Sequence, residues 1–181
     1  MSERDFTPLG GRAVFEGRII SVHVERFEFP DGEEVEREIV RHPGAVGVVV
    51  YDDTHVWLVR QPREAVAERD LLEIPAGRLD VEGEPPLETA KRELAEEIGM
   101  AAERWEHFIT YYSSVGVMDE KVHVYFATGL RPAQAEAEHN ERIEIVRWPL
   151  EELEAAIMSC RDAKTLIGLL ELARRRATHG R

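Results

Sequence analysis

The sequence predicts a mixed α/β (α+β) fold in which helices cover a β-sheet. Residues 45–51, AVGVVVY, form a near-continuous apolar run, which is typical of a strand buried on both faces. Residues 86–98 predict a helix, because Pro86 needs no amide hydrogen at the first helical position and Gly99 can end the last turn. Two more helices are expected near the C-terminus, so the expected architecture is a sheet layered with helices.

The first 42 residues predict an antiparallel β arm. Val22, Val24, Phe27 and Phe29 partly alternate with polar neighbours, and Pro-Asp-Gly at 30–32 supplies a hairpin turn. A sheet of this size is marginal alone, so it is expected to pack against the main body or against a second copy of the chain. We therefore expect an arm over residues 1–42 and a main domain over residues 43–181.

The remaining segments predict short strands and two closing helices. A turn at Asp52–Asp53 separates the apolar run from the next strand, and an acidic loop spans residues 131–141. The strand after this turn is expected to end at Gln61. Further strands are expected over residues 71–75, 106–112, 121–130 and 142–148, and helices over residues 150–159 and 162–176. In the last helix, the residues expected to pack in the core are Leu166, Leu169, Leu170 and Ala173.

Composition limits the class of partner. With 43% hydrophobic and 33% charged residues among 181, the chain resembles an ordinary soluble protein of one main domain. No apolar run approaches the roughly 20 residues of a membrane span, and no secretory signal is visible, so we expect no membrane partner and a cytoplasmic location. The net charge of -13 works against nucleic-acid binding, but an anionic small molecule could bind if metal ions bridge the like charges.

Acidic side chains are concentrated on the predicted helix and the loop before it. They could form a solvated face held by ion pairs, or they could hold a divalent metal. Glu96 lies three residues and Glu97 four residues after Glu93, so all three project from one side of the helix. Spacing alone leaves both explanations open. A separate apolar stripe, which can face the core, consists of Leu87, Leu94 and Ile98.

This stretch closely resembles the box of the Nudix hydrolases. The family pattern runs Gly, five residues, Glu, seven residues, Arg-Glu, an aliphatic residue, any residue, Glu-Glu, any residue, Gly and an aliphatic residue. Six residues rather than five separate Gly77 from Glu84, which we interpret as an insertion in the loop at residues 81–83. The other positions match in register, with Glu84, Arg92, Glu93, Leu94, Glu96, Glu97, Gly99 and Met100.

Other segments are similar to the ADP-ribose pyrophosphatase branch of this family. The resemblance implies a Nudix fold, with a mixed sheet sandwiched between helices. It also implies hydrolysis of a small nucleoside diphosphate sugar, ADP-ribose, to AMP and ribose 5-phosphate by a homodimer that exchanges its N-terminal arms. The similar segments are RQPRE at residues 60–64, LLEIPAGRLD at residues 71–80, the β arm and the acidic loop before RIEIVRW.

The resemblance further implies a metal site and its brace. Mg²⁺ is the expected cation, with Mn²⁺ as a substitute, and such hard cations prefer oxygen ligands. Arg92 is expected to pair with Glu84 and to stiffen the loop against the helix, a task that suits the bidentate guanidinium. The implied metal ligands are Glu93 and Glu97, assisted by Glu96 and by the backbone carbonyl of Ala76.

The general base is expected in the acidic loop, as in similar enzymes. Glu141 stands seven residues before Trp148, the position of the family's loop glutamate, whereas Glu144 falls inside the expected strand. The other rivals are Glu138 and His139.

Substrate contacts are implied at three places. Arg63 is expected to hold a phosphate oxygen, and Glu73 to accept a hydrogen bond from the adenine amino group or a ribose hydroxyl. Phe27 and Phe29 are expected either to stack on adenine, also in a partner's site, or to form the core of the small sheet.

One departure from the branch concerns specificity. A Ser-Pro-Gly segment is usual beyond the box, but here it is Ser114-Val115-Gly116. Another nucleoside diphosphate sugar such as GDP-mannose, or an oxidised nucleotide, is therefore an alternative substrate. A non-catalytic ADP-ribose-binding module is the other class of function, although such a module is expected to lose box carboxylates or to carry a DNA-binding segment.

Overall fold

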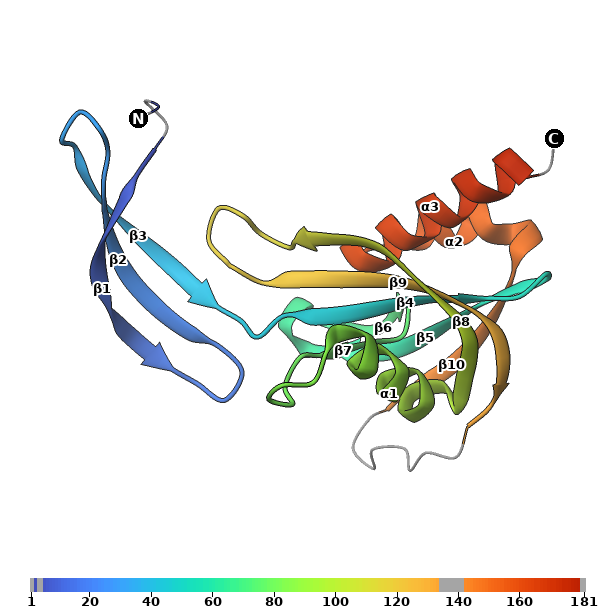
Figure 1. Ribbon diagram of the computed structural model, residues 1–181. Helices are drawn as coiled ribbons and strands as arrows, with labels where there is room; N and C mark the ends of the chain where they lie inside the picture. The colour runs from blue at the N-terminus through green and yellow to red at the C-terminus, as the bar shows by residue number, and fades with distance from the viewer. Residues whose placement is uncertain (1, 3–4, 134–141, 180–181) are drawn as a thin grey trace. The chain divides into compact units, whose positions relative to one another are not determined.

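The computed structural model describes residue 2, residues 5–133 and residues 142–179. The chain divides into two compact units, each with its own sheet (Figure 1). The N-terminal unit comprises Met1–Gly44 together with Tyr111–Lys121, and the second unit comprises Ala45–Thr110 and Val122–Arg181. The segment Tyr111–Lys121 thus belongs with the arm, an association that nothing in the sequence indicated.

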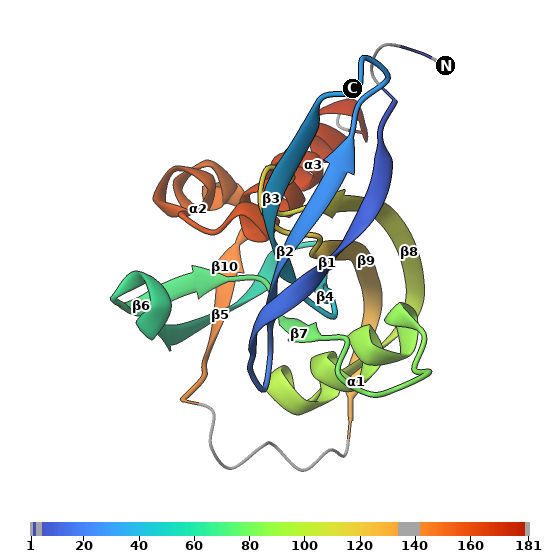
Figure 2. The ribbon, with the colours of Figure 1, turned by 90° about the vertical axis from the view of Figure 1, so that its left-hand side faces the viewer.

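Three antiparallel strands form the sheet of the N-terminal unit, in the order β1-β2-β3 (Figure 2). β1 covers Thr7–Glu16, β2 covers Ser21–Glu28 and β3 covers Glu34–Arg41. In the turn between β2 and β3, Gly32 donates to the Phe29 carbonyl at 2.9 Å and has a φ of +87°, which glycine adopts without strain. The predicted hairpin is confirmed, and β1 adds a third strand to it.

The segment Tyr111–Lys121 is attached to β3 by backbone and side-chain bonds. The Val40 amide donates to the Val117 carbonyl at 2.8 Å, and the Asp119 amide donates to the Val40 carbonyl at 3.2 Å. The Asp119 carboxylate also pairs with Arg41 at 2.9 Å and accepts from the His42 amide at 2.9 Å. These contacts explain why the loop and the arm form one unit.

A seven-stranded mixed sheet forms the second unit. Its central strand β4 (Ala45–Tyr51) pairs parallel with β9 (Lys121–Pro132) and antiparallel with β5 (His55–Arg63) and β7 (Ala76–Arg78). The path runs β10-β5-β4-β9-β8, and β6 adds to β5. The remaining bounds are Glu68–Glu73 for β6, Met100–Tyr112 for β8 and Glu144–Pro149 for β10.

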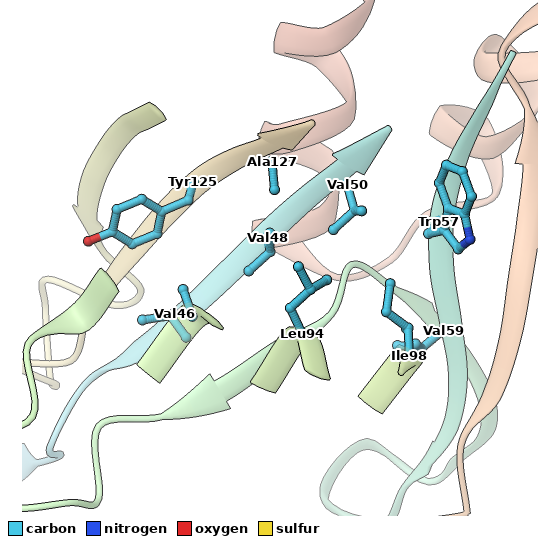
Figure 3. Close-up of a cluster of buried hydrophobic side chains, with 10 residues drawn as sticks. Val46, Val48, Val50, Trp57, Val59, Leu94, Ile98, Tyr125 and Ala127 are labelled. Carbon is cyan, nitrogen blue, oxygen red and sulfur yellow. The ribbon is translucent and has the colours of Figure 1, made fainter. Parts of the chain in front are cut away.

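Helices cover both faces of this sheet. α1 (Pro86–Ile98) lies on one face, and α2 (Leu153–Ser159) and α3 (Ala163–His179) lie on the other (Figure 1). Val46, Val48 and Val50 share a buried cluster with Leu94 of α1 (Figure 3). On the opposite face, Gly168 of α3 approaches Val49 so closely that an added Cβ would lie 2.5 Å from Cγ2 of that valine. The predicted sandwich around a doubly buried strand is confirmed.

Three expectations need correction. β6 covers Glu68–Glu73 rather than residues 71–75, and β8 begins at Met100 rather than at residue 106, while the short β7 is an additional strand. Leu170 is 50% exposed, whereas Leu169 and Leu172 are buried. Leu170 lies one residue beyond Leu169, and a single helical step turns a side chain by about 100°, away from the buried stripe. Among the described residues, no helix has the length and apolar content to cross a membrane.

Leu94→Ala should destabilise the second unit strongly. Leu94 is fully buried in the cluster between α1 and β4, so truncation leaves a cavity and should lower the free energy of unfolding by about 2–5 kcal/mol. Leu170→Ala is the matched control, because that side chain is half exposed on α3, and its effect should be much smaller. Urea unfolding of both variants checks this. Equal losses of stability would contradict the packing described here.

Candidate active site

Helix α1 presents its carboxylates away from its apolar stripe. Its first residue is Pro86, and it ends where Gly99, with a φ of 66°, donates its amide to the Ala95 carbonyl. Leu94 and Ile98 lie in the buried cluster, and Leu87 packs against it, as the sequence predicted. The other side of the helix carries Glu93, Glu96 and Glu97.

Glu93 and Glu97 both approach β7, at the turn that follows β6. The Ala76 amide donates to Oε2 of Glu97 at 2.9 Å, and the Glu97 side chain is largely buried. A Cβ added to Gly77 would lie 2.0 Å from Cδ of Glu93. Only a glycine allows this approach, so Ala76 and Gly77 form a cradle for the two carboxylates.

Arg92 joins the loop to the helix carboxylates. Its Nη2 lies 3.3 Å from Oε2 of Glu84, and its Nη1 lies 2.9 Å from both Glu93 Oε1 and Glu96 Oε2. Burial lowers the pKa of Arg92, but the hydrogen bond to Glu84 and the charges of Glu93 and Glu96 outweigh burial and raise it. Arg92 therefore remains charged. It donates hydrogen bonds to three carboxylates where the sequence indicated one, and Asp80 lies 3.7 Å from its Nη2.

Thr89 is a member of the brace that the sequence did not reveal. Its hydroxyl donates to Oε2 of Glu84 at 2.7 Å, and this bond is the main cause that lowers the pKa of Glu84, with help from Arg92. The inserted residue of the box lies in a tight turn, in which the Glu84 amide donates to the Val81 carbonyl at 3.1 Å. The insertion therefore leaves the register of the helix unchanged.

The donor set has the chemistry that a hard divalent cation requires. Glu93 and Glu97 offer carboxylate oxygens beside the backbone of Ala76, and Mg²⁺ needs only one or two carboxylates when substrate phosphates and waters complete its shell. In the part of the chain that the structure describes, no three His, Cys, Asp or Glu side chains are already gathered at metal-binding geometry. Arg92 stands between Glu93 and Glu96, so a cation that used Glu96 would compete with this guanidinium.

A second cluster of charges surrounds Glu73 at the end of β6. Glu73 is 1% exposed, and Arg63 donates to it from Nε at 2.6 Å and from Nη2 at 2.9 Å. Lys164 of α3 donates to the same carboxylate. Burial raises the pKa of Glu73, but the Arg63 hydrogen bonds and the Lys164 charge outweigh burial and lower it. Both oxygens of Glu73 are thus engaged within the protein.

Arg63 also lies in the field of the α1 carboxylates. The hydrogen bond to Glu73 is the main cause that raises the pKa of Arg63, and the charges of Glu97 and Asp162 raise it further. The charge of one predicted metal ligand, Glu97, therefore acts on one predicted substrate contact, Arg63.

The expected base Glu141 and its rivals Glu138 and His139 lie outside the described residues. Glu144, the remaining rival, is the first residue of β10, where it pairs in register with Arg60 and is exposed.

A pocket of about 490 Å³ lies within the N-terminal unit. Phe29 and Phe27 line it together with Phe6, and the rings of Phe6 and Phe27 meet edge to face at 5.4 Å. Charged groups of both signs line it: Arg37 and Arg41, and Glu38 with Asp119, which pairs with Arg41. The other lining residues are Val35, Ile39, Tyr112 and residues 115–118. Aromatic faces and guanidinium groups of this kind suit a flat, polar ligand.

Known proteins resemble this chain over most of its length. It is 41% identical over 150 residues to an ADP-ribose pyrophosphatase of Mycobacterium tuberculosis, covering 82% of this chain and 72% of the relative. A methanol dehydrogenase activator of Bacillus methanolicus is 38% identical, with 86% of each chain covered, and an ADP-ribose pyrophosphatase of Bacillus subtilis is 40% identical, with 84% of each covered.

A solved structure and a family description agree with these relatives. The crystal structure of an ADP compounds hydrolase superposes with a TM-score of 0.86 over 100% of this chain and 99% of its own, at 24% identity, which supports the fold. Residues 41–167 match the NUDIX domain. This range contains the whole box, with Glu93 and Glu97, and the Ala76–Gly77 cradle. The chain therefore belongs to the Nudix family.

Proposed function

We propose that this chain is a metal-dependent pyrophosphatase that hydrolyses ADP-ribose to AMP and ribose 5-phosphate. The observation that carries the proposal is the approach of Glu93 and Glu97 to Ala76 and Gly77, in a Nudix chain whose relatives include ADP-ribose pyrophosphatases. Mg²⁺ is the proposed cation, with Mn²⁺ as a substitute. When bound, it would neutralise charge on the diphosphate and on the leaving oxygen.

The residues of the chain divide the remaining work. A water attacks one phosphorus, the bond from that phosphorus to the bridging oxygen breaks, and the electron pair leaves on the other phosphate. Glu141 is proposed to accept the proton of the attacking water. Arg63 is proposed to hold a phosphate oxygen through Nη1, because Nε and Nη2 are directed at Glu73.

Glu73 receives a different role from the one expected. A carboxylate that is 1% exposed and bonded to two cations has little capacity left for an adenine or ribose group. We propose that Glu73 orients Arg63 and contacts no substrate. The brace of Glu84 and Arg92 is likewise proposed to orient Glu93 and Glu96 rather than to touch the diphosphate.

The N-terminal unit is proposed to bind the base and to exchange between two chains. Phe29 lines a pocket of a size that admits an adenine ring. Apolar side chains of β1 and the turn after it are exposed, Phe15 at 54% and Ile19 at 47%, and a second copy of the chain would cover them. Light scattering should therefore give a molecular mass of twice the 20.7 kDa of one chain. The proposed location of this dimer is the cytoplasm. A mass of one chain at assay concentration would sink the exchanged dimer.

Val115 favours a second candidate, a different nucleoside diphosphate. Its side chain is 82% exposed and lies at the pocket where the branch usually has proline. A panel with ADP-ribose, GDP-mannose and an oxidised nucleotide at saturating Mg²⁺ decides between them by kcat/KM. Faster release of GMP from GDP-mannose than of AMP from ADP-ribose would move the assignment to the second candidate.

Glu97→Gln should nearly abolish AMP release. Glutamine keeps an oxygen for the Ala76 amide, so the fold should persist, but it removes a charged metal ligand. We expect the rate of AMP release to fall by at least about 100-fold. Removing a residue that only orients a metal ligand costs up to about 100-fold, and removing the ligand itself should cost at least as much. Glu88→Gln is the matched control, because Glu88 lies on the same helix, is half exposed and forms a surface pair with Lys91. Near-normal hydrolysis by Glu97→Gln would refute the metal assignment.

Gly77→Ala should separate metal binding from stability. The backbone of Gly77 lies outside the left-handed region, so alanine fits its φ, but the new methyl must displace the carboxylate end of Glu93. A flexible side chain can yield, so the free energy of unfolding should change by less than about 1 kcal/mol. The Mg²⁺ concentration for half-maximal rate should rise by about 10–100-fold. Thermal unfolding and a Mg²⁺ titration measure the two quantities, and an unchanged titration would contradict the role of the cradle.

A further inference from the structure

We propose that Lys164 is a positioning residue for substrate, acting on Arg63 through the buried carboxylate of Glu73. The inference rests on the proposed function, in which Arg63 holds a phosphate oxygen. Lys164 lies on α3, far along the chain from both residues, and no motif drew attention to it. Its side chain is 14% exposed, and its ammonium group bonds to Glu73.

Lys164 is held from two sides. Its Nζ lies 2.9 Å from Oδ2 of Asp162, in addition to its bond with Glu73. Asp162 is fixed in turn by Thr165, which donates to it from its amide at 3.0 Å and from its hydroxyl at 2.5 Å. The Thr165 hydroxyl oxygen accepts from the Ile74 amide at 2.8 Å. The first turn of α3 is therefore latched to the residues that immediately precede the Ala76–Gly77 cradle.

The charges explain what Lys164 contributes. Glu73 and Asp162 carry two negative charges, which Arg63 and Lys164 balance. Without Lys164, the guanidinium of Arg63 alone faces Glu73, and the cluster acquires a net negative charge beside the proposed diphosphate site. A negative cluster repels a diphosphate, and the charge of Glu73 then cancels the attraction between Arg63 and the diphosphate. Lys164 thus keeps Arg63 effectively cationic toward substrate.

This role predicts a change in binding rather than in chemistry. Lys164→Met should raise the KM for ADP-ribose by about tenfold while kcat stays within about twofold, because Arg63 holds ground state and transition state alike. The dissociation constant of an ADP-ribose analogue with a methylene bridge between the phosphorus atoms, measured by calorimetry with Mg²⁺, should rise by the same factor. Lys164→Arg keeps the positive charge, so this variant should retain most of the wild-type affinity for the analogue.

The controls isolate charge and stability. Lys91→Met removes the same charge from an exposed position on α1 and should leave both constants unchanged. Lys164→Gln keeps a hydrogen-bond donor for Glu73 without the charge, so it serves if the methionine variant does not fold, and it should bind as weakly. If the role of Lys164 is purely structural, its substitution should lower the melting temperature but leave the KM and the affinity for the analogue at their wild-type values. That result would overturn the proposal. Wild-type protein that binds the analogue but releases no AMP would overturn the hydrolase assignment, while the affinity comparison would still test Lys164.

Discussion

Strand β4 is packed on both faces, and the two helices that cover it carry the box carboxylates of α1 and Lys164 of α3. α1 contacts the face formed by Val46, Val48 and Val50, while α3 contacts the face of Val49 through Gly168. Because β7 pairs with β4, the residues Ala76 and Gly77 are brought against α1. The same core packing that stabilises the sheet therefore determines where the carboxylates of α1 and the lysine of α3 can lie.

In two charge clusters of the second unit, cations are held between carboxylates. Arg92 joins Glu84 to Glu93 and Glu96, and Arg63 with Lys164 surrounds Glu73. An unpaired buried carboxylate would be costly or would become neutral, whereas the bonds to Arg63 and the charge of Lys164 outweigh burial and lower the pKa of Glu73. Arg63 and Lys164 balance the charges of Glu73 and Asp162. Arg92 alone faces three carboxylates, so the α1 cluster keeps an excess of negative charge that a bound metal cation could offset.

Much of the second unit could be predicted because its signals are local. The ends of α1 follow from Pro86 and Gly99, and the burial of β4 follows from its valine run. β7 has three residues, too few for a periodic pattern, and its place depends on pairing with β4. The 1% exposure of Glu73 and its bonds to Arg63 and Lys164 were not predicted. The bond between Glu73 and Lys164 spans 91 positions of the chain, a long-range contact that no local pattern encodes.

The two departures from the family pattern fall away from the groups proposed to perform the chemistry. The inserted residue of the box is absorbed in the turn between Val81 and Glu84, while Gly77 still contacts Glu93 and the Ala76 amide still contacts Glu97. Val115 belongs to the N-terminal unit, which contains none of the α1 carboxylates. Under the proposed function, Val115 would influence which nucleoside is bound, and the metal ligands proposed on α1 belong to the other unit. Substrate choice and hydrolysis would then be carried by separate parts of the chain.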